Sequence, residues 1–329
     1  MTATLRLAAP AVGARLLGVG SYQPAQVVSN HDLAKIIDTD DEWIRSRVGI
    51  VSRRVAAEGE LLVDMSTAAA VAAIKDAGLV PTDIDTVIVA TCTMPTAVPN
   101  AAASVATALG INGVGAFDLN AACAGFTYAL AVGADLVRAG SATRVVVVGA
   151  EKFSDWVDPT DRSTAIIFAD GAGAAVIGPA SAEQGAGIGP VVWGSSGDMA
   201  EVISIADRNS FLHQEGQTVF RWATTKIAPM ALEAVELAGL QPADIDVLIP
   251  HQANLRILES IGRALRKAGA RDDMVLARDI VHSGNTSAAS VPMALDHLRA
   301  DGSVQAGDVA LLVGFGAGLC FAAQAVLLP

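Results

Sequence analysis

Cysteine, aromatic residues and charged residues are all scarce in this sequence of 329 residues. Its three cysteines, Cys92, Cys123 and Cys320, form no C-x-x-C pair, which argues against a zinc site or a disulfide framework. Charged residues make up 17% and hydrophobic residues 52%, so we expect a large buried core and a subunit interface. The net charge of −12 argues against nucleic acid as a partner.

The sequence also lacks a long, unbroken apolar segment. Residues 86–117 carry no charge, but Pro95, Pro99 and several glycines would break a membrane-spanning helix there. Arg6 and Arg15 interrupt the apolar N-terminus, so no signal peptide is predicted. We therefore expect a soluble, cytoplasmic protein without a membrane partner.

Cys123 has the most informative position in the chain. It lies in NAACAGFTYAL, residues 120–130, between a predicted strand at 113–119 and a predicted helix at 126–137. Unpaired N–H groups and the positive end of the helix dipole favour a thiolate over a thiol at such a place. The small neighbours would let a substrate carbonyl approach the sulfur. A buried structural cysteine is the alternative, and this segment alone does not choose between the two.

Two distant segments carry polar residues in comparable positions. His251 follows the apolar residues 247–249 and Pro250, and Asn285 lies between a glycine and a predicted helix. Polar residues at the C-terminal ends of buried strands build the sites of open α/β sheets. Taken singly, His251 could be a hydrogen-bonded core histidine and Asn285 a helix N-cap. Together with Cys123 they form a plausible set for acyl-thioester chemistry.

The chain contains an internal duplication. Residues 74–93 and 235–254 both read as a helix, the pattern AGL-x-P-x-DID and then a buried strand, with Pro81 and Pro242 at matching positions. An offset of about 160 residues is too long for a solenoid repeat and indicates two copies of one domain.

Apolar strands such as VVVVG and ALLVG predict sheets covered by helices on both faces. The expected fold is an α/β five-layered αβαβα sandwich of two duplicated halves. After an N-terminal tail at 1–13, we place the first half at 14–178 and the second at 179–329. The first half would supply Cys123 and the second His251 and Asn285, which puts the site at the junction.

Several motifs in a consistent order carry a family resemblance from about Ala14 to Leu328: DTDDEWIRSRVGI, NAACAGF, DPTDRST, FADGAGAAV, PHQANLR, HSGNTSAAS and FGAG. The chain resembles the thiolase-fold condensing enzymes, most closely the β-ketoacyl-acyl-carrier-protein synthase III family. The pairing of a histidine with an asparagine points to this branch, because the elongating synthases use two histidines.

The resemblance implies a two-step decarboxylative Claisen condensation. Cys123 would take the acyl group from a short acyl-CoA and release CoA. Malonyl-acyl carrier protein would then lose CO2, and its enolate would attack the acyl group to give 3-oxoacyl-acyl carrier protein. Acyl-CoA is a substrate in this scheme, and neither a cofactor nor a metal is implied.

The chemistry explains the residue types. Loss of CO2 places negative charge on the thioester oxygen, where neutral His251 and the amide of Asn285 can both donate hydrogen bonds. One such donor contributes about 3 kcal/mol to lowering the barrier. By resemblance, a separate oxyanion hole for acyl transfer would use the backbone N–H groups of Cys123 and Ala317.

The resemblance also implies a CoA site. Trp43 and Arg47 are four residues apart in a predicted helix and hence share a face. Trp43 would stack on adenine, Arg162 would close over its other side, and Thr39 and Arg47 would lie near phosphate. Asn254 would support the histidine and the pantetheine end. A half-buried tryptophan with surface arginines is the plainer interpretation.

Two further assignments concern protein partners. Arg256, Arg263 and Lys267 are spaced by seven and four residues, so they align on one helix face of an acidic protein. A solvated face is the commoner meaning of such a pattern, but we favour docking of an acidic carrier protein. By resemblance, Val98 occupies an acyl-pocket position across the dimer, where a small side chain leaves room for branched or longer starters.

Three rival functions fit parts of the pattern. A starter-unit priming ketosynthase or acyltransferase of a polyketide or other natural-product pathway would keep Cys123, His251 and Asn285. A non-catalytic partner of a ketosynthase heterodimer would have no need of the nucleophile. A cysteine hydrolase would release free acid from acyl-CoA without a malonyl donor.

Overall fold

The centre of the molecule contains two five-stranded sheets. In the computed structural model, which describes residue 11 and residues 13–329, the first sheet has its strands in the order β1-β7-β6-β4-β5. Strand β4 runs parallel to β5 and β6, whereas β7 runs antiparallel to β6 and β1. The strands are β1 (Ala14–Tyr22), β4 (Thr86–Ala90), β5 (Gly115–Leu119), β6 (Val145–Lys152) and β7 (Asp170–Pro179).

The second sheet repeats this topology. Its order is β12-β11-β13-β14-β8, with β11 parallel to β12 and β13, and β14 antiparallel to β13 and β8. The strands are β8 (Ile188–Ser195), β11 (Val247–Pro250), β12 (Val275–Leu276), β13 (Val309–Gly316) and β14 (Cys320–Leu327). All ten strands thus divide into one group within residues 14–179 and one within 188–327. The exact boundary between 178 and 179 stays a prediction.

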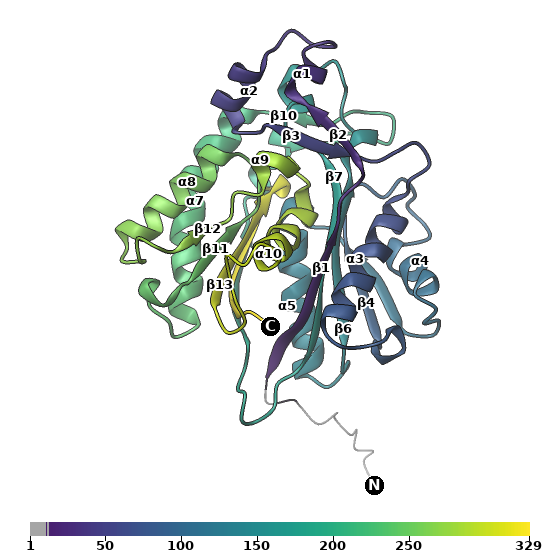
Figure 1. Ribbon diagram of the computed structural model, residues 1–329, viewed down its shortest axis with the longest axis vertical. Coiled ribbons are helices and arrows are strands. Elements are labelled where there is room, and N and C mark those ends of the chain that lie inside the picture. The colour runs from purple at the N-terminus through teal and green to yellow at the C-terminus, as the bar shows by residue number, and fades with distance from the viewer. Residues whose placement is uncertain (1–10, 12) are drawn as a thin grey trace.

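Helices complete a sandwich of five layers (Figure 1). Helices α3 (Leu62–Asp76) and α4 (Ala101–Ala108) cover the outer face of the first sheet, and α7 (Gly216–Leu237) and α8 (Leu255–Lys267) cover that of the second. Helices α5 (Gly125–Arg138) and α10 (Ser290–Ala300) lie between the sheets and contact both. The predicted fold class is confirmed. Among the described helices, none has the length and apolar character that a bilayer crossing requires.

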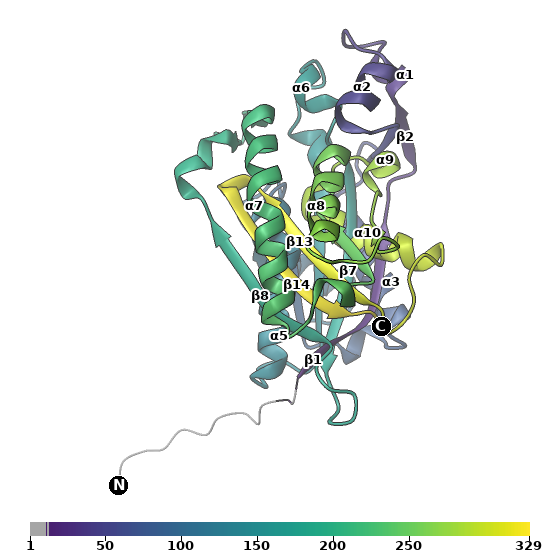
Figure 2. The same ribbon diagram turned by 90° about the vertical axis from the view of Figure 1, so that its left-hand side faces the viewer.

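Short elements gather beyond one end of the sheets, where Figure 2 shows α1, α2 and α6 close together. Some of them supply residues that line the cavity described below. The short elements are β2 (Gln26–Ser29), α1 (Asn30–Leu33), α2 (Asp41–Val48), β3 (Ser52–Val55), α6 (Arg162–Ala165), β9 (Ile203–Ser204), β10 (His213–Gln214) and α9 (Ile280–Ser283).

The apolar strands form because both of their faces are covered. Val145 to Val148 of β6 are all fully buried, and so are Val87 to Ala90 of β4. A parallel strand between two helical layers has no solvent face, so it shows no alternation of apolar and polar residues. The inner helices add Phe126 and Leu130 to the core that joins the two sheets.

Matching prolines open matching turns. Pro81 and Pro242 each begin a 3-10 turn, η1 (Pro81–Asp83) and η5 (Pro242–Asp244). In each turn the aspartate side chain accepts a hydrogen bond from the backbone N–H that precedes the proline, at 2.9 Å in η1 and 2.7 Å in η5. Proline suits this position because its fixed φ is preorganised for a helical turn and its missing N–H would be unpaired there.

A second pair of matching turns connects each sheet to its inner helix. Turn η2 (Ala122–Ala124) precedes α5, and η6 (Ser287–Ala289) precedes α10. Both turns begin with a non-glycine residue at positive φ, +45° at Ala122 and +49° at Ser287. In both, an asparagine two residues earlier accepts a hydrogen bond from that residue's N–H: Asn120 at 3.1 Å and Asn285 at 2.9 Å. We call these two segments the paired turns.

Candidate active site

Cys123 occupies the middle of the first paired turn, where its side chain is 9% exposed. Gly316, the last residue of β13, lies directly against it. A Cβ added to Gly316 would lie 2.6 Å from Cβ and 2.8 Å from Sγ of Cys123. Glycine is therefore required at 316 by space, and the missing side chain leaves the backbone of the second half in contact with the sulfur.

The surroundings of Cys123 act on its thiol in opposite directions. Burial raises the pKa of Cys123 to about 11, while hydrogen bonds from the Ser287 hydroxyl and from the backbone N–H groups of Ala317 and Cys123 lower it. The expectation that the helix start favours a thiolate is therefore wrong for the resting protein, because desolvation outweighs the backbone donors. Those two donors are nevertheless the pair that the sequence resemblance assigned to the oxyanion hole.

His251 follows β11 and is 2% exposed. Its backbone N–H donates to Val313 at 2.7 Å, and its Nδ1 lies 2.7 Å from the Ser290 hydroxyl oxygen. That oxygen also accepts the N–H of Gln252 at 3.3 Å, and its own hydrogen can be donated to Nδ1. In the tautomer with that bond, the ring proton lies on Nε2. Burial lowers the pKa of His251 to about 3, which keeps the imidazole neutral.

Asn285 opens the second paired turn and is 4% exposed. Two hydrogen bonds fix its backbone to the segment before β7. The N–H of Asn285 donates to the carbonyl oxygen of Ile167, and the carbonyl oxygen of Asn285 accepts from the N–H of Ala169, both at 2.9 Å. Its Oδ1 accepts from Ser287. Among the described residues, no protein group accepts a hydrogen bond from its Nδ2, which leaves this amide donor for a ligand.

One cavity of about 910 Å³ unites these residues. Cys123, His251 and Asn285 all line it, together with Phe315, Gly316 and Ala317. The Phe315 ring meets the His251 ring edge-on, with 5.3 Å between the ring centroids. Three side chains that lie far apart in the sequence thus face a shared space, in which a bound thioester would meet one nucleophile and two neutral donors.

The same cavity extends to the residues expected to bind CoA. Trp43 and Arg47 line it, and the guanidinium carbons of Arg47 and Arg162 lie 5.6 and 4.8 Å from the centroid of the Trp43 ring. Arg162 also donates to the backbone oxygen of Asp38 at 3.0 Å. The Oγ1 atom of Thr39 is buried without a hydrogen-bond partner among the described residues.

Asn254 connects the two regions. Its side chain caps α8 by accepting the N–H of Arg256 at 2.9 Å, and its Nδ2 donates to the backbone oxygen of Arg47 at 3.2 Å. Its side chain therefore ties the turn that carries His251 to helix α2, and it makes no hydrogen bond to the imidazole itself among the described contacts.

The three cations of α8 have different surroundings. Arg256 lines the cavity mouth and lies over the Phe220 ring at 5.1 Å from its centroid. Arg263 is exposed and lies 4.0 Å from Glu259 one turn earlier. Lys267 is exposed at the end of the helix. The pattern leaves a positive outer face beside the cavity.

Val98 lies apart from the other predicted site residues. Its side chain is 82% exposed and it does not line the cavity of this chain. The expectation for Val98 involved a second subunit, so its role stays a prediction. In residue 11 and residues 13–329, no three His, Cys, Asp or Glu side chains are grouped as a metal ion would need.

Sequence reasoning missed three polar residues of the site. Ser290 lies beside His251, Ser287 lowers the pKa of Cys123, and the buried Glu151 accepts hydrogen bonds from both Cys92 and Ser287. The sequence did contain a signal for Glu151. It is the polar residue that follows the apolar stretch VVVVGA, as His251 is the polar residue that follows its own apolar strand. The two serines stood in the same motif as Asn285, but nothing in that motif showed what they would contact.

Comparison with known proteins gives a consistent result along the chain. Residues 117–197 match the family described as 3-oxoacyl-[acyl-carrier-protein (ACP)] synthase III, and residues 235–328 match its C-terminal family. The β-ketoacyl-[acyl-carrier-protein] synthase III 4 of Streptomyces coelicolor is 50% identical over 317 residues, covering 96% of this chain and 99% of the relative. The mycobacterial enzyme of Mycobacterium avium is 49% identical over 325 residues, with 95% of each chain covered.

Solved structures agree with the sequence relatives. A priming β-ketosynthase from a polyketide biosynthetic pathway superposes with a TM-score of 0.93 at 42% identity, covering 99% of this chain and 98% of the other. The 3-oxoacyl-[acyl-carrier-protein] synthase III of Aquifex aeolicus superposes with a TM-score of 0.90 at 37% identity, covering 96% and 100%.

Proposed function

The chain belongs to the 3-oxoacyl-[acyl-carrier-protein] synthase III family, and on that premise we propose that it condenses a short acyl-CoA with malonyl-acyl carrier protein. The products are 3-oxoacyl-acyl carrier protein, CoA and CO2, in the step that starts fatty-acid synthesis. One observation carries this proposal: Cys123, His251 and Asn285 line the same cavity, which also reaches Trp43.

In the first half-reaction, Cys123 attacks the acyl-CoA thioester and CoA leaves. The N–H groups of Cys123 and Ala317 hold the developing oxyanion. This assignment is supported by the direction in which both groups act on the thiol, since they lower the pKa of Cys123. Gly316 keeps the approach open because it has no side chain to fill it.

In the second half-reaction, the malonyl group loses CO2 and its thioester oxygen becomes negative. Nε2 of His251 and Nδ2 of Asn285 donate to that oxygen. A neutral imidazole suits this role, and burial supports neutrality by lowering the pKa of His251 to about 3. Decarboxylation supplies the carbanion, so we expect no resident cofactor or metal.

The nucleotide of CoA binds at the far part of the cavity. Adenine stacks on Trp43, with Arg162 on its other side and Arg47 and Thr39 near phosphate; the two guanidinium groups over the ring support this assignment. Because Arg162 lies 4.8 Å from the ring centroid, it has to move outward to admit a base. Asn254 holds this region to the turn that carries His251.

The remaining partners follow from the same scheme. The acidic carrier protein docks on Arg256, Arg263 and Lys267 of α8, the enzyme works as a homodimer, and Val98 enters the acyl pocket of the partner subunit. Since acyl-CoA and carrier-bound malonyl groups are cytoplasmic substrates, we place the enzyme in the cytoplasm.

A second candidate keeps the chemistry and changes the pathway. The chain superposes on a priming β-ketosynthase of polyketide synthesis with a TM-score of 0.93 at 42% identity, which favours a starter-unit enzyme as the alternative. The two readings differ in the starter acyl group and in the carrier protein, and they share Cys123, His251 and Asn285.

The test is to incubate the protein with a panel of acyl-CoA thioesters and to measure the mass of Cys123 peptides before and after malonyl-acyl carrier protein is added. We expect an acyl adduct on Cys123 that disappears as 3-oxoacyl-acyl carrier protein forms, with branched starters at least as effective as acetyl. Absence of an adduct would indicate a non-catalytic partner, and free acid without a malonyl donor would indicate a hydrolase. Either result would refute the proposal.

A further inference from the structure

Arg53 of β3 is a buried cation that the mechanism above does not use. Its side chain is 1% exposed, and burial lowers the pKa of Arg53 to about 10. The four hydrogen bonds of its guanidinium to the described residues all go to neutral oxygen atoms. A buried charge without an oppositely charged partner is costly, so the position of Arg53 calls for an explanation.

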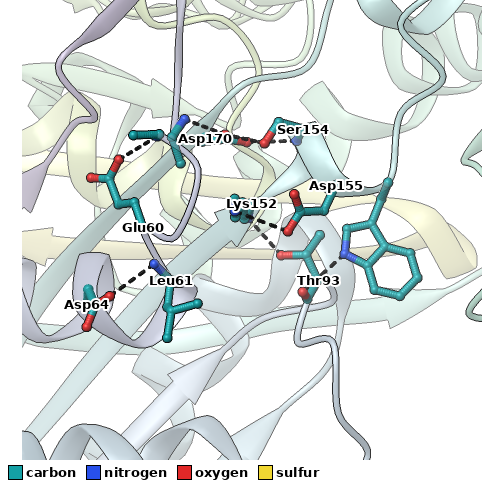
Figure 3. A network of polar contacts seen from close by, with 11 residues as sticks. Glu60, Leu61, Asp64, Thr93, Lys152, Ser154, Asp155 and Asp170 are labelled. Atoms are coloured by element: carbon teal, nitrogen blue, oxygen red, sulfur yellow. Dashed lines mark hydrogen bonds and ion pairs between the residues drawn. The ribbon is translucent and has the colours of Figure 1, made fainter.

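The buried carboxylate next to β3 has other partners. Asp170 on β7 is fully buried, and its Oδ2 accepts the N–H of Ala56, just beyond the end of β3, at 2.8 Å. The Asp170 carboxylate also accepts the backbone N–H and the hydroxyl of Ser154, at 2.9 and 2.6 Å, and Figure 3 shows Asp170 beside Ser154. These hydrogen bonds fix the end of β3 and go to groups other than Arg53.

Three segments supply the acceptors of the Arg53 guanidinium. Oδ1 of Asn30, in α1, accepts from both Nη1 and Nη2, at 3.1 and 3.0 Å. The carbonyl oxygen of Ile166, directly after α6, accepts from Nη2 at 2.9 Å, and that of Val28, in β2, accepts from Nη1 at 3.3 Å. A guanidinium can make these bonds at the same time because its donors form a rigid planar fork.

Asn30 connects Arg53 to helix α2. Its Nδ2 donates at 2.9 Å to Oδ1 of Asp41, the first residue of α2, and at 2.8 Å to the carbonyl oxygen of Ile50, two residues beyond the last one. One amide nitrogen thus holds both ends of the helix that carries Trp43. Asn30 is 1% exposed, so these bonds are shielded from water.

The hydrogen bonds of Arg53 and Asn30 therefore join the two sides of the expected adenine site. Ile166 is the C-cap of α6, whose first residue is Arg162, and Figure 2 shows α6 close to α2. The guanidinium carbon of Arg162 lies 4.8 Å from the centroid of the Trp43 ring. Arg53 and Asn30 connect these two helices but do not line the cavity.

We propose that Arg53 is a positioning residue for the nucleotide of CoA, an inference that rests on the proposed function. Through Asn30 and Ile166, its guanidinium holds the backbones of α2 and α6 at a fixed spacing. When a base enters, the side chain of Arg162 moves outward while both helices stay in place. Adenine then meets a preformed site, so less binding free energy is lost in ordering that site.

The positive charge of Arg53 offers a different explanation, because a buried cation would attract the phosphates of CoA from a distance. Asn30→Ala separates the two explanations, since it keeps the guanidinium and its bond to Ile166 but removes both bonds to α2. Arg53→Met removes the charge and the fork but keeps the Cβ beside Gly284. If position matters, the two variants and their combination have the same effect, because all three break one chain of hydrogen bonds.

The test compares two thioesters that differ in the nucleotide, using the full-length protein. Formation of acyl-Cys123 from isobutyryl-CoA and from isobutyryl-pantetheine is followed by mass spectrometry, and the Kd for CoA is measured by titration calorimetry. We expect R53M, N30A and the double variant each to lower the rate constant of acylation by isobutyryl-CoA about tenfold and to raise the Kd for CoA by the same factor. Acylation by isobutyryl-pantetheine, which has no nucleotide, should stay at the wild-type rate.

Arg54→Met is the matched control, because it removes the neighbouring cation of the same strand. Successive residues of a strand face opposite sides, and the Arg54 guanidinium donates to the backbone oxygen atoms of Pro24 and Ala25. Both thioesters should therefore react with R54M as they do with the wild type, and its Kd for CoA should be unchanged.

Several outcomes would overturn the proposal. These are equal losses for the two thioesters, a wild-type Kd for CoA in either R53M or N30A, a further loss in the double variant, or an absence of CoA binding to the wild type. If R53M does not fold, N30A decides by itself. If the wild type binds CoA but takes up no acyl group, the proposed function fails, and the Kd values still decide the role of Arg53.

Discussion

Single residues in this site act as much through the space they leave as through the groups they carry. Gly316 leaves the Cys123 sulfur open to the backbone N–H of Ala317, and Ala122 and Ala124 flank the nucleophile with the smallest possible side chains. The polar residues are fixed by one specific partner each, as Ser290 fixes His251 and Ser287 binds Asn285. Reactivity therefore depends on how these side chains are placed.

Replacing Gly316 by alanine should block acyl transfer. The new Cβ would lie 2.8 Å from Sγ of Cys123, so the sulfur or its turn has to shift. A shift of this kind slows a positioned reaction by about 10²-fold. The measurement is the rate of acyl-Cys123 formation by mass spectrometry. Gly197→Ala serves as the control, because a Cβ there has no atom within 4 Å. Rapid acylation of G316A would contradict the prediction.

Asn285→Ala should separate the two half-reactions. It removes the donor aimed at the malonyl thioester oxygen, so CO2 release from malonyl-acyl carrier protein should fall by about 10²- to 10³-fold, while acylation by acyl-CoA persists. Asn120→Ala is the matched variant, since it removes the equivalent turn hydrogen bond from the other half. Equal rates of decarboxylation in the two variants would show that decarboxylation depends on the turn hydrogen bond and not on the amide donor.

Much of the site could be predicted at the scale of single residues, because each predicted residue stands in a recognisable short sequence pattern. Cys123, His251 and Asn285 each stand where an apolar strand or a glycine gives way to a turn, which a sequence reveals directly. The contact of His251 with Ser290 spans 39 residues, and no local pattern encodes it. The rise in the pKa of Cys123 was missed for the same reason, because burial arises from the packing of both halves.

Among the elements, helix α10 has a titratable contact that joins it to the segment before α9. Nδ1 of His297 lies 2.7 Å from the Asp279 carboxylate, and its Nε2 is 3.5 Å from the Ser21 hydroxyl on β1. The hydrogen bond that the ring donates to Asp279 raises the pKa of His297, with the charges of Asp296 and Asp301 adding to it and burial opposing it. The folded protein therefore favours the protonated ring.

This pair should make stability depend on pH. Because the folded pKa of His297 lies above the unfolded value of about 6.5, the stabilisation is complete below that value and is lost as pH rises through the folded pKa. The difference in free energy of unfolding between wild type and H297N, from urea titrations, should thus shrink from acidic to alkaline pH. In a D279N background the pH dependence should be weaker. An identical dependence in both backgrounds would exclude Asp279 as the cause.

Element boundaries followed the sequence closely where a residue type has a fixed conformational role. Pro81 and Pro242 begin their turns as the duplicated pattern indicates. The helix predicted at 126–137 runs from Gly125 to Arg138, whereas the strand predicted at 113–119 begins only at Gly115. Gly113 has a φ of +91°, which a strand does not accommodate, so the chain is still turning there.

The molecule as a whole is acidic, with a net charge of −12, and α8 is an exception to that charge. Its outer face carries Arg263 and Lys267, with Arg256 at the cavity mouth. A carrier protein that delivers a malonyl group has to stay beside this mouth while the group reaches His251. Complementary charge at a rim increases the association rate, and added salt screens it.

Reversing Arg263 and Lys267 to glutamate should therefore raise the KM for malonyl-acyl carrier protein about tenfold at low salt, and less at high salt. Acylation by acyl-CoA should not change, because neither residue lines the cavity. Lys75→Glu on the exposed face of α3 is the control for added negative charge away from α8, to be compared with each single reversal, Arg263→Glu and Lys267→Glu. A salt-independent KM in the double variant, equal to that of wild type, would place the docking surface elsewhere.

The paired turns bear on the origin of the reactive geometry. A left-handed backbone conformation at a non-glycine residue is often interpreted as strain that is part of the catalytic mechanism. Here Ser287 adopts it as Ala122 does, although the residue after Ser287 is Ala288, which has no reactive group. The unusual conformation therefore goes with the turn into the inner helix in both copies, after β5 in the first and after α9 in the second. The same bend thus carries the thiol of Cys123 in one copy and the amide of Asn285 in the other.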